Sequence, residues 1–200
     1  MTGYADYLFL LSPPQTIMDE VARYRKASAK YIGDFMGVHS PAHISLAQVE
    51  RQKPYFADST LGRMEQRLTI MPTIQLHIDG FKYFNHLHDK KTIYAAIRNT
   101  QIADSWFELM KKNLGIKKAI LPHITVCRNI TDEEFKTLWP HFRHKKWTES
   151  FWVNELTVTR RETFEPYAKW QTIKKIPFKG NGLQQGINAP TGRDEQINLF

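Results

Sequence analysis

Two short segments of the chain echo each other. Residues 121–126 read LPHITV, and residues 41–46 read PAHISL. Each segment has a histidine, a β-branched aliphatic residue, a hydroxyl residue and another aliphatic residue, with a proline just before them. The echo is either a coincidence between two strands that begin with histidine, or the sign of two halves of one active site.

Alternation along a strand indicates where these side chains point. Successive residues of a strand face opposite sides of the sheet, so residues two apart share a side. His43 and Ser45 then share one side, and so do His123 and Thr125, while the aliphatic residues between them face the core. Each strand is therefore expected to present an imidazole beside a hydroxyl.

A pair of such faces suits acid–base chemistry on a phosphodiester. A neutral imidazole can remove a proton from water or from a 2′-hydroxyl, and a protonated imidazole can donate one to the departing oxygen. The hydroxyls of Ser45 and Thr125 can bind the non-bridging oxygens and offset the charge of the transition state. Four-residue patterns recur by chance, so the interpretation depends on the strand context and on the repetition.

The rest of the chain predicts an α+β fold with mostly antiparallel strands. The repeat indicates two similar lobes, and each histidine strand is followed by a helix. A capping-box pattern at Thr131-Asp-Glu-Glu134 opens the last helix, and Asp79-Gly80 is interpreted as a hairpin turn. Strands are expected at 4–11, 43–49, 71–79, 81–84, 92–99, from 123, at 151–159 and at 170–178, and helices at 12–31, 58–68, 104–113 and from 131.

Length and composition indicate one folded unit. The chain has 200 residues, of which 42% are hydrophobic and 24% charged, as in ordinary globular proteins. We expect a single domain over 1–178 and a flexible tail over 179–200, where Gly, Asn, Gln and Pro dominate.

The net charge and the cysteine content limit which partners and which cellular location are expected. The net charge of +8 favours an anionic ligand such as RNA or a nucleotide. The single cysteine, Cys127, excludes an internal disulfide and fits a reducing, cytoplasmic location. No apolar run approaches the length of a membrane span, and no signal peptide is recognisable, so we expect a cytoplasmic monomer without membrane contact.

With these motifs, the sequence resembles the 2H phosphoesterase superfamily, in particular its 2′-5′ RNA ligase-like and cyclic phosphodiesterase members. The resemblance rests on His43-Ile-Ser45-Leu and His123-Ile-Thr125-Val and extends more weakly over residues 4–178. It implies two pseudo-symmetric lobes around a central cleft, with one motif from each lobe. It also implies metal-independent action on 2′,3′-cyclic or 2′-5′ phosphodiester bonds, with His43, Ser45, His123 and Thr125 as catalytic residues and no cofactor. The first motif has serine where threonine is commoner, which keeps the hydroxyl.

Other residues are candidates for binding the substrate. Tyr94 is either a cleft residue that stacks on a base or a half-exposed strand aromatic, and Phe9 is either a second such residue or part of the core. Tyr167 follows Arg160 and Arg161, where the resemblance implies an aromatic residue near the cleft. His77 is either a third cleft group or a solvent-facing histidine. The pair His86-Leu-His88 is too weak a pattern to predict a metal site.

The last five residues, QINLF, resemble the sliding-clamp-binding motif of bacterial replication and repair proteins. Leu199 and Phe200 would fill an apolar pocket while Gln196 binds at its rim. The alternative is an uninformative tail, because five-residue motifs recur by chance.

Three functions remain open from the sequence. The leading one is a metal-independent phosphoesterase that cleaves, or in reverse forms, a cyclic or 2′-5′ phosphodiester of RNA or a nucleotide. The second is an RNA- or nucleotide-binding module without catalysis, and the third is a clamp-associated accessory protein. The substrate, the direction of reaction and the roles of the two histidines as acid and base stay open.

Overall fold

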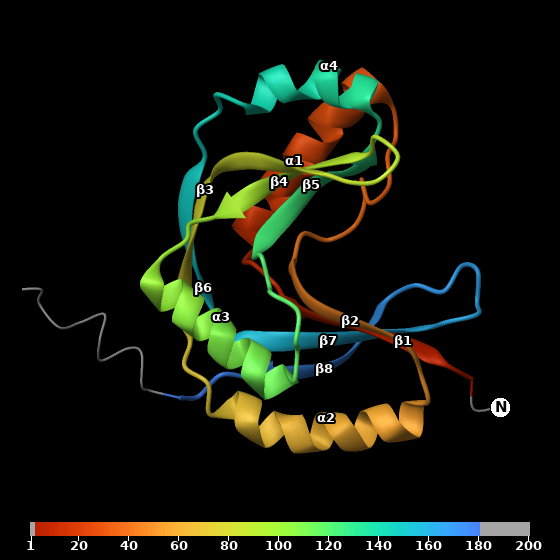
Figure 1. Ribbon diagram of the computed structural model, residues 1–200, viewed down its shortest axis with the longest axis vertical. Coiled ribbons are helices and arrows are strands. Elements are labelled where there is room, and N and C mark those ends of the chain that lie inside the picture. The colour runs from red at the N-terminus through yellow and green to blue at the C-terminus, as the bar shows by residue number, and fades with distance from the viewer. Residues whose placement is uncertain (1–2, 181–200) are drawn as a thin grey trace, which may run out of the picture.

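The computed structural model describes residues 3–180, which form four helices and eight strands (Figure 1). In chain order they are β1 (Ala5–Leu11), α1 (Gln15–Ile32), β2 (Ile44–Gln52), α2 (Pro54–Thr69), β3 (Ile74–Asn85), β4 (Lys91–Ile97), α3 (Gln101–Leu114), β5 (His123–Ile130), α4 (Asp132–Phe142), β6 (Thr148–Val153), β7 (Glu155–Glu162) and β8 (Gln171–Pro177). Within this described part, no helix has the length and apolar character needed to span a bilayer.

The strands form two four-stranded sheets, with orders β2-β1-β7-β8 and β5-β4-β3-β6. All the pairings of neighbouring strands in these sheets are antiparallel. The succession β1-α1-β2-α2 is repeated as β4-α3-β5-α4, and the second strand of each repeat, β2 or β5, lies at the edge of its sheet. This confirms the predicted α+β fold of two pseudo-symmetric antiparallel lobes.

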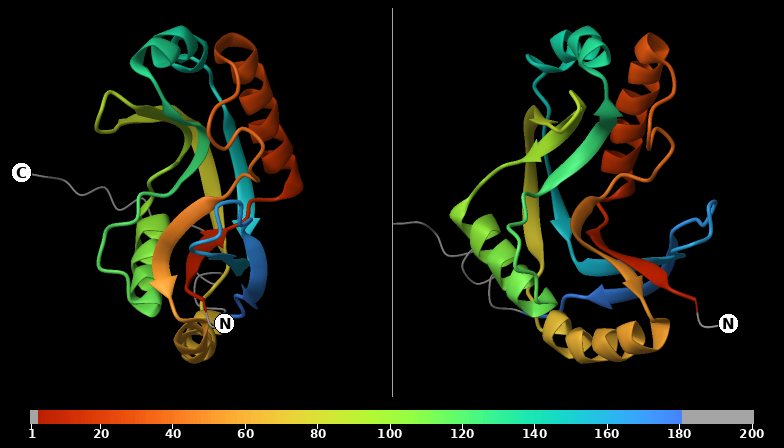
Figure 2. Two further views of the ribbon diagram at one scale, coloured as in Figure 1. Left: turned by 90° about the vertical axis from the view of Figure 1, so that its right-hand side faces the viewer. Right: turned by 45° about the vertical axis from the view of Figure 1, so that its right-hand side comes forward.

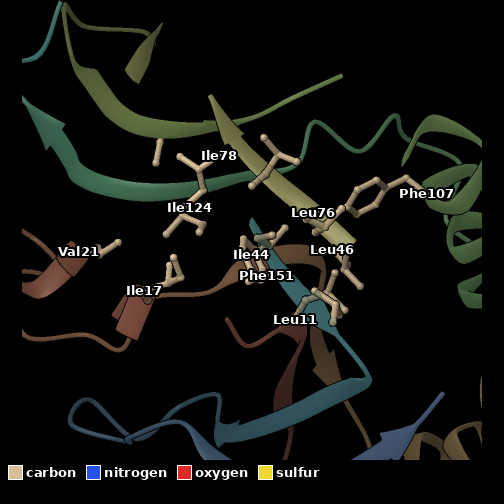
Figure 3. Packing of buried hydrophobic residues seen from close by; sticks show 14 of the residues in the cluster. Leu11, Ile17, Val21, Ile44, Leu46, Leu76, Ile78, Phe107, Ile124 and Phe151 are labelled. Atoms are coloured by element: carbon tan, nitrogen blue, oxygen red, sulfur yellow. The ribbon is translucent and has the colours of Figure 1, made fainter. Parts of the chain in front are cut away.

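The two lobes share one hydrophobic core. Figure 3 shows Ile17 of α1, Ile44 of β2, Ile78 of β3 and Ile124 of β5 packed in the same region. All four side chains are fully buried, and each such burial stabilises the fold by about 1.5–3 kcal/mol. Because Ile44 and Ile124 follow the two motif histidines directly, core packing fixes both histidine strands.

The helices that follow β1 and β4 pack in different places. Helix α1 contacts β5 and α4 of the second repeat, whereas α3 contacts α2 and β3. Figure 2 shows α1 beside α4 at one end of the molecule, with α2 and α3 at the other end. The apolar stripe of α1, with Ile17, Val21 and Tyr24 buried, accounts for this docking. Helix α1 of the first repeat therefore packs against β5, the histidine strand of the second repeat.

The predicted turn at Asp79-Gly80 is wrong. Strand β3 runs through it as one strand, with a register shift between Ile78 and Phe81 where Gly80 takes φ 67°. A glycine of this conformation fits a β-bulge as well as a hairpin turn. The hairpin turn lies instead between His86 and Lys90, where the His86 amide donates to the Lys90 carbonyl (2.7 Å).

The single strand predicted at 151–159 is also wrong. It divides at Asn154 into β6 and β7, which belong to different sheets. The buried residues change phase there, from Phe151 and Val153 to Leu156 and Val158. A strand cannot bury both sets on one face, so the phase change marks the crossover between lobes.

Several helix ends differ from expectation. Helix α1 begins at Gln15 with no side-chain cap, and the Ser12 hydroxyl lies 3.5 Å from that of Thr157 instead. Helix α2 begins at Pro54, four residues before the predicted start, because proline suits a first turn. The cap of α3 is Thr100 rather than Asp104.

The last helix begins where the sequence predicts, and the chain beyond β8 is bonded to the body of the protein as far as residue 180. The capping box of Thr131 and Glu134 is confirmed at α4. Lys179 and Gly180 still bond to the α2–β3 segment, through amide donation to the carbonyls of Thr69 and Met71 (2.8 Å each). The rest of the predicted tail lies outside the described residues.

Candidate functional site

The two histidine motifs meet at one cleft of about 680 Å³. His43, Ser45, His123 and Thr125 all line it, and the intervening Ile44 and Ile124 are fully buried in the core. The alternation predicted from sequence therefore describes both strands correctly at these positions. The catalytic role of the four residues stays a prediction.

Both imidazoles are oriented by the same local bond. His43 Nδ1 lies 3.0 Å from the carbonyl oxygen of Pro41, and His123 Nδ1 lies 2.7 Å from that of Leu121. A carbonyl oxygen only accepts hydrogen bonds, so Nδ1 carries the proton in both rings and donates it. In each histidine, Nε2 is therefore the nitrogen that gains or loses a proton, as an acid–base pair requires.

The environment favours the neutral form of both rings. Burial lowers the pKa of His43, and the charges of Arg25, His123 and Arg128 lower it further, against the opposing effect of the Pro41 carbonyl. Burial also lowers the pKa of His123, with Arg128 adding to the shift and the Leu121 carbonyl opposing it. A bound phosphate would reverse part of this effect, since an anion favours an imidazolium.

The charged groups of the cleft are all basic. Arg25, Lys118 and Arg128 line it, and no acidic residue of the described chain does. Such a wall attracts an anion and offsets the charge of a phosphate in its transition state. The prediction from sequence missed all three cations.

Strand irregularity explains why Arg128 was missed. Strict alternation from His123 and Thr125 would put residue 127 in the cleft, but Cys127 is fully buried. The pairing of β5 with β4 has two register shifts, and Asn129 has φ 59°. These shifts change the phase of the strand and bring Arg128 to the cleft side.

An aromatic cluster lies against His123. Phe84 and Tyr94 stack with ring centroids 4.2 Å apart, and their centroids lie 5.0 and 5.1 Å from that of His123. Tyr94 is buried and is not among the residues that line the cleft, whereas Phe84 is. Phe84 therefore contacts His123 and lines the cleft, whereas Tyr94 contacts His123 without lining the cleft. The position of Phe84 was not predicted, because the bulge in β3 changes which face of the strand it lies on.

Of the remaining candidates, Phe9, Tyr167 and His77 do not line the cleft, whereas His86 does. Phe9 is buried in the core, and Tyr167 is 93% exposed on the β7–β8 loop; neither lines the cleft. His77 bonds to Ser150 (2.6 Å), and His86 lines the cleft with its Nε2 3.0 Å from the Thr92 hydroxyl.

Two further predictions concern metals and the tail. No group of three or more His, Cys, Asp or Glu side chains that could hold a metal ion occurs between residues 3 and 180. The tail residues proposed to bind a clamp, Gln196, Leu199 and Phe200, lie outside the part of the chain that the structure describes.

Solved structures share this architecture at low sequence identity. E. coli LigT complexed with 3′-AMP gives a TM-score of 0.62 at 13% identity, over 88% of this chain and 99% of that one. TT0787 of Thermus thermophilus gives 0.63 at 12% identity, with the same coverage. Usb1 of Kluyveromyces marxianus gives 0.52 at 13% identity, again over 88% and 99% of the two chains. These likenesses show a common fold.

Sequence comparison identifies the family. No curated protein sequence matches the chain at a significant level. The model of the 2′-5′ RNA ligase superfamily matches residues 13–164, a span that contains both histidine motifs, all of the sheet β5-β4-β3-β6, and β2 and β7 of the other sheet. The chain therefore belongs to the 2′-5′ RNA ligase superfamily, as its paired histidine motifs predicted.

Proposed function

We propose that this protein is a metal-independent phosphoesterase acting on 2′,3′-cyclic or 2′-5′ phosphodiester bonds of RNA or nucleotides. The observation that carries the proposal is the matched pair His43 and His123, which line one cleft and both keep Nδ1 bonded to a carbonyl. The two Nε2 atoms can then act as base and acid on one phosphate.

Hydrolysis of a cyclic phosphate follows from this arrangement. Nε2 of the neutral histidine accepts a proton from water while the water oxygen forms a bond to phosphorus. The bond from phosphorus to the 2′ or 3′ oxygen breaks, and the protonated histidine donates its Nε2 proton to that oxygen. The product is a phosphomonoester, and the two histidines have exchanged protonation states. The reverse sequence forms the diester.

The surrounding residues supply what the histidines do not. The hydroxyls of Ser45 and Thr125 line the same cleft and can donate to the non-bridging oxygens. The basic residues of the wall offset the charge that builds on those oxygens. Structures of E. coli LigT with 3′-AMP, phosphate, ATP and NADP+ show a protein of this fold with nucleotides and phosphate, which supports a ligand of that class.

The test is turnover of a 2′,3′-cyclic nucleotide in the presence of EDTA. We expect His43→Ala and His123→Ala each to lower kcat by about 10²–10⁴-fold, because each removes one proton-transfer group. His144→Ala is the matched control, since His144 is exposed and does not line the cleft. Undiminished turnover in both cleft variants, or loss of wild-type activity with EDTA, would contradict the proposal. RNA binding that weakens with salt, with no turnover of any cyclic or 2′-5′ substrate, would indicate a binding module instead.

A further inference from the structure

Arg25 of α1 holds an unusual position for a charged residue. It is 5% exposed, yet it lines the cleft. Its guanidinium donates to three backbone carbonyls: Nε to Val126 (3.3 Å), Nη2 to Thr125 (2.6 Å) and Nη1 to Ser40. All three acceptors are neutral.

Two of these carbonyls belong to the second histidine motif, and the third lies directly before the first motif. Ser40 directly precedes Pro41, whose carbonyl orients His43. Thr125 is itself a motif residue on β5, two positions after His123, and Val126 follows it. One side chain therefore joins the backbone directly before the first motif to that of the second. This is possible because α1 packs against β5 of the other repeat.

The positive charge of Arg25 has no carboxylate partner in the described chain. None of the ion pairs formed by residues 3–180 includes it. A buried cation without a counter-ion is costly, and the cost falls when an anion binds beside it. A purely structural link between carbonyls does not need a cation at the wall of the cleft, whereas a cation at that place attracts a phosphate.

We propose that Arg25 is a positioning residue of the phosphoesterase site, which sets the separation of the two histidine motifs and supplies an un-neutralised charge beside the substrate phosphate. The inference rests on the proposed function. Its charge also acts on one histidine more than on the other. The groups that face His43 are Arg25 from α1 and His123 and Arg128 from β5, with His86 and Lys118 elsewhere on the cleft wall.

Arg25 thereby makes the two motifs unequal. Burial is the main cause of the lowered pKa of both rings, and Arg128 adds to it at both, whereas Arg25 adds to it at His43 alone. Removing the charge at position 25 should raise the pKa of His43 and leave that of His123 nearly unchanged.

The experiment compares Arg25→Met, Arg25→Lys and the control Arg23→Met. Arg23 is exposed on the same helix and pairs with Glu20. For each variant, the histidine titrations are followed by NMR, kcat and KM are measured with a 2′,3′-cyclic nucleotide, inorganic phosphate binding is measured, and the thermal midpoint is recorded. Arg23→Met should match the wild type in kcat and in the titrations.

In Arg25→Met, the pKa of His43 should rise and phosphate should bind more weakly. The variant should also lose about 100-fold in kcat, since small misplacements of reacting groups cost that much. Arg25→Lys should keep the His43 titration near that of the wild type, because it keeps the charge. Its kcat should still fall, because the single ammonium of lysine cannot form the hydrogen bonds that the planar guanidinium of Arg25 donates to three carbonyls.

Several results would overturn the proposal. A folded Arg25→Met protein with unchanged kcat and an unshifted His43 titration would do so, even if its thermal midpoint fell. If Arg25→Met does not fold, Arg25→Lys decides, and wild-type kcat in that variant would refute the positioning role. A wild-type protein that turns over no cyclic or 2′-5′ substrate refutes the proposed function, whereas the NMR titrations and phosphate binding still test Arg25.

Discussion

At the scale of single residues, hydrogen bonds to backbone carbonyls define the chemistry of this site. The Nδ1–H of each histidine is held by a carbonyl two residues upstream, and Arg25 is held by three. Bonds of this kind orient a side chain without neutralising it. The cleft therefore keeps its basic character while its two histidines and Arg25 are held in place.

Asp6 is also a buried charged residue, but unlike Arg25 it has a partner of opposite charge, Arg161. It is 3% exposed at the start of β1. Burial raises the pKa of its carboxyl, but bonds from the Arg51 amide, Thr163 and Arg161 outweigh burial and lower the pKa overall. The carboxylate ties β1 to residues at the ends of β2 and β7 and is expected to act on stability alone.

We predict that Asp6→Asn lowers the free energy of unfolding by about 3 kcal/mol at neutral pH, because charge-assisted bonds to a buried group are lost. A carboxyl whose pKa is lower in the folded state stabilises above its unfolded pKa, and this contribution disappears as pH falls through the folded pKa. The wild type should thus lose stability in acid more steeply than the variant. Chemical denaturation from pH 7 to pH 3 measures this, and parallel curves for the two proteins would contradict it.

At the scale of elements, irregular strands decide which side chains reach the cleft. The shifts in β5 turn Arg128 toward it, and the bulge in β3 at Gly80 puts Phe84 at the wall. Gly80 has φ 67° and its amide donates to the Trp147 carbonyl (2.9 Å), so the bulge is bonded to the segment before β6. The bulge is therefore a fixed part of the sheet.

The same substitution should have opposite effects at two glycines. Gly80→Ala should lower the free energy of unfolding by about 1 kcal/mol, because a left-handed backbone disfavours Cβ. Gly62→Ala, in the interior of α2, should raise it by about 0.5–1 kcal/mol, because alanine is the better helix former. A Cβ meets no close atom at either site, so backbone conformation alone separates the two. Equal shifts in urea midpoint would show that the bulge is not strained by a side chain.

Regular strand segments could be predicted from the sequence, whereas contacts between distant elements could not. Regular alternation over four residues sufficed to predict that His43 shares a face with Ser45 and that His123 shares one with Thr125. The resemblance to the family implied that the two faces meet, and all four residues do line one cleft. Arg25 could not be found that way, because it is a helical residue whose partners lie 15 to 101 positions away in sequence. The crossover at Asn154 could have been found, since the phase of buried residues changes there.

At the scale of the whole molecule, the cleft depends on two sheets that share one core. Neither histidine strand completes the site, since β2 and β5 are edge strands of different sheets. The hydrophobic cluster includes residues of both sheets and of all four helices. The separation of the two imidazoles is thus a property of how the sheets pack together.

We therefore predict that residues 3–180 unfold as one cooperative unit. Leu11 of β1 and Ile93 of β4 are both fully buried, one in each sheet. Leu11→Ala and Ile93→Ala should each lower the free energy of unfolding by about 2–5 kcal/mol. Because the core is shared, either substitution should speed hydrogen exchange of the slowest amides in both sheets to the same degree. If each variant speeds exchange only in its own sheet, the lobes are separate folding units. The two histidines would then be held at their separation by α1 and Arg25 rather than by the common core.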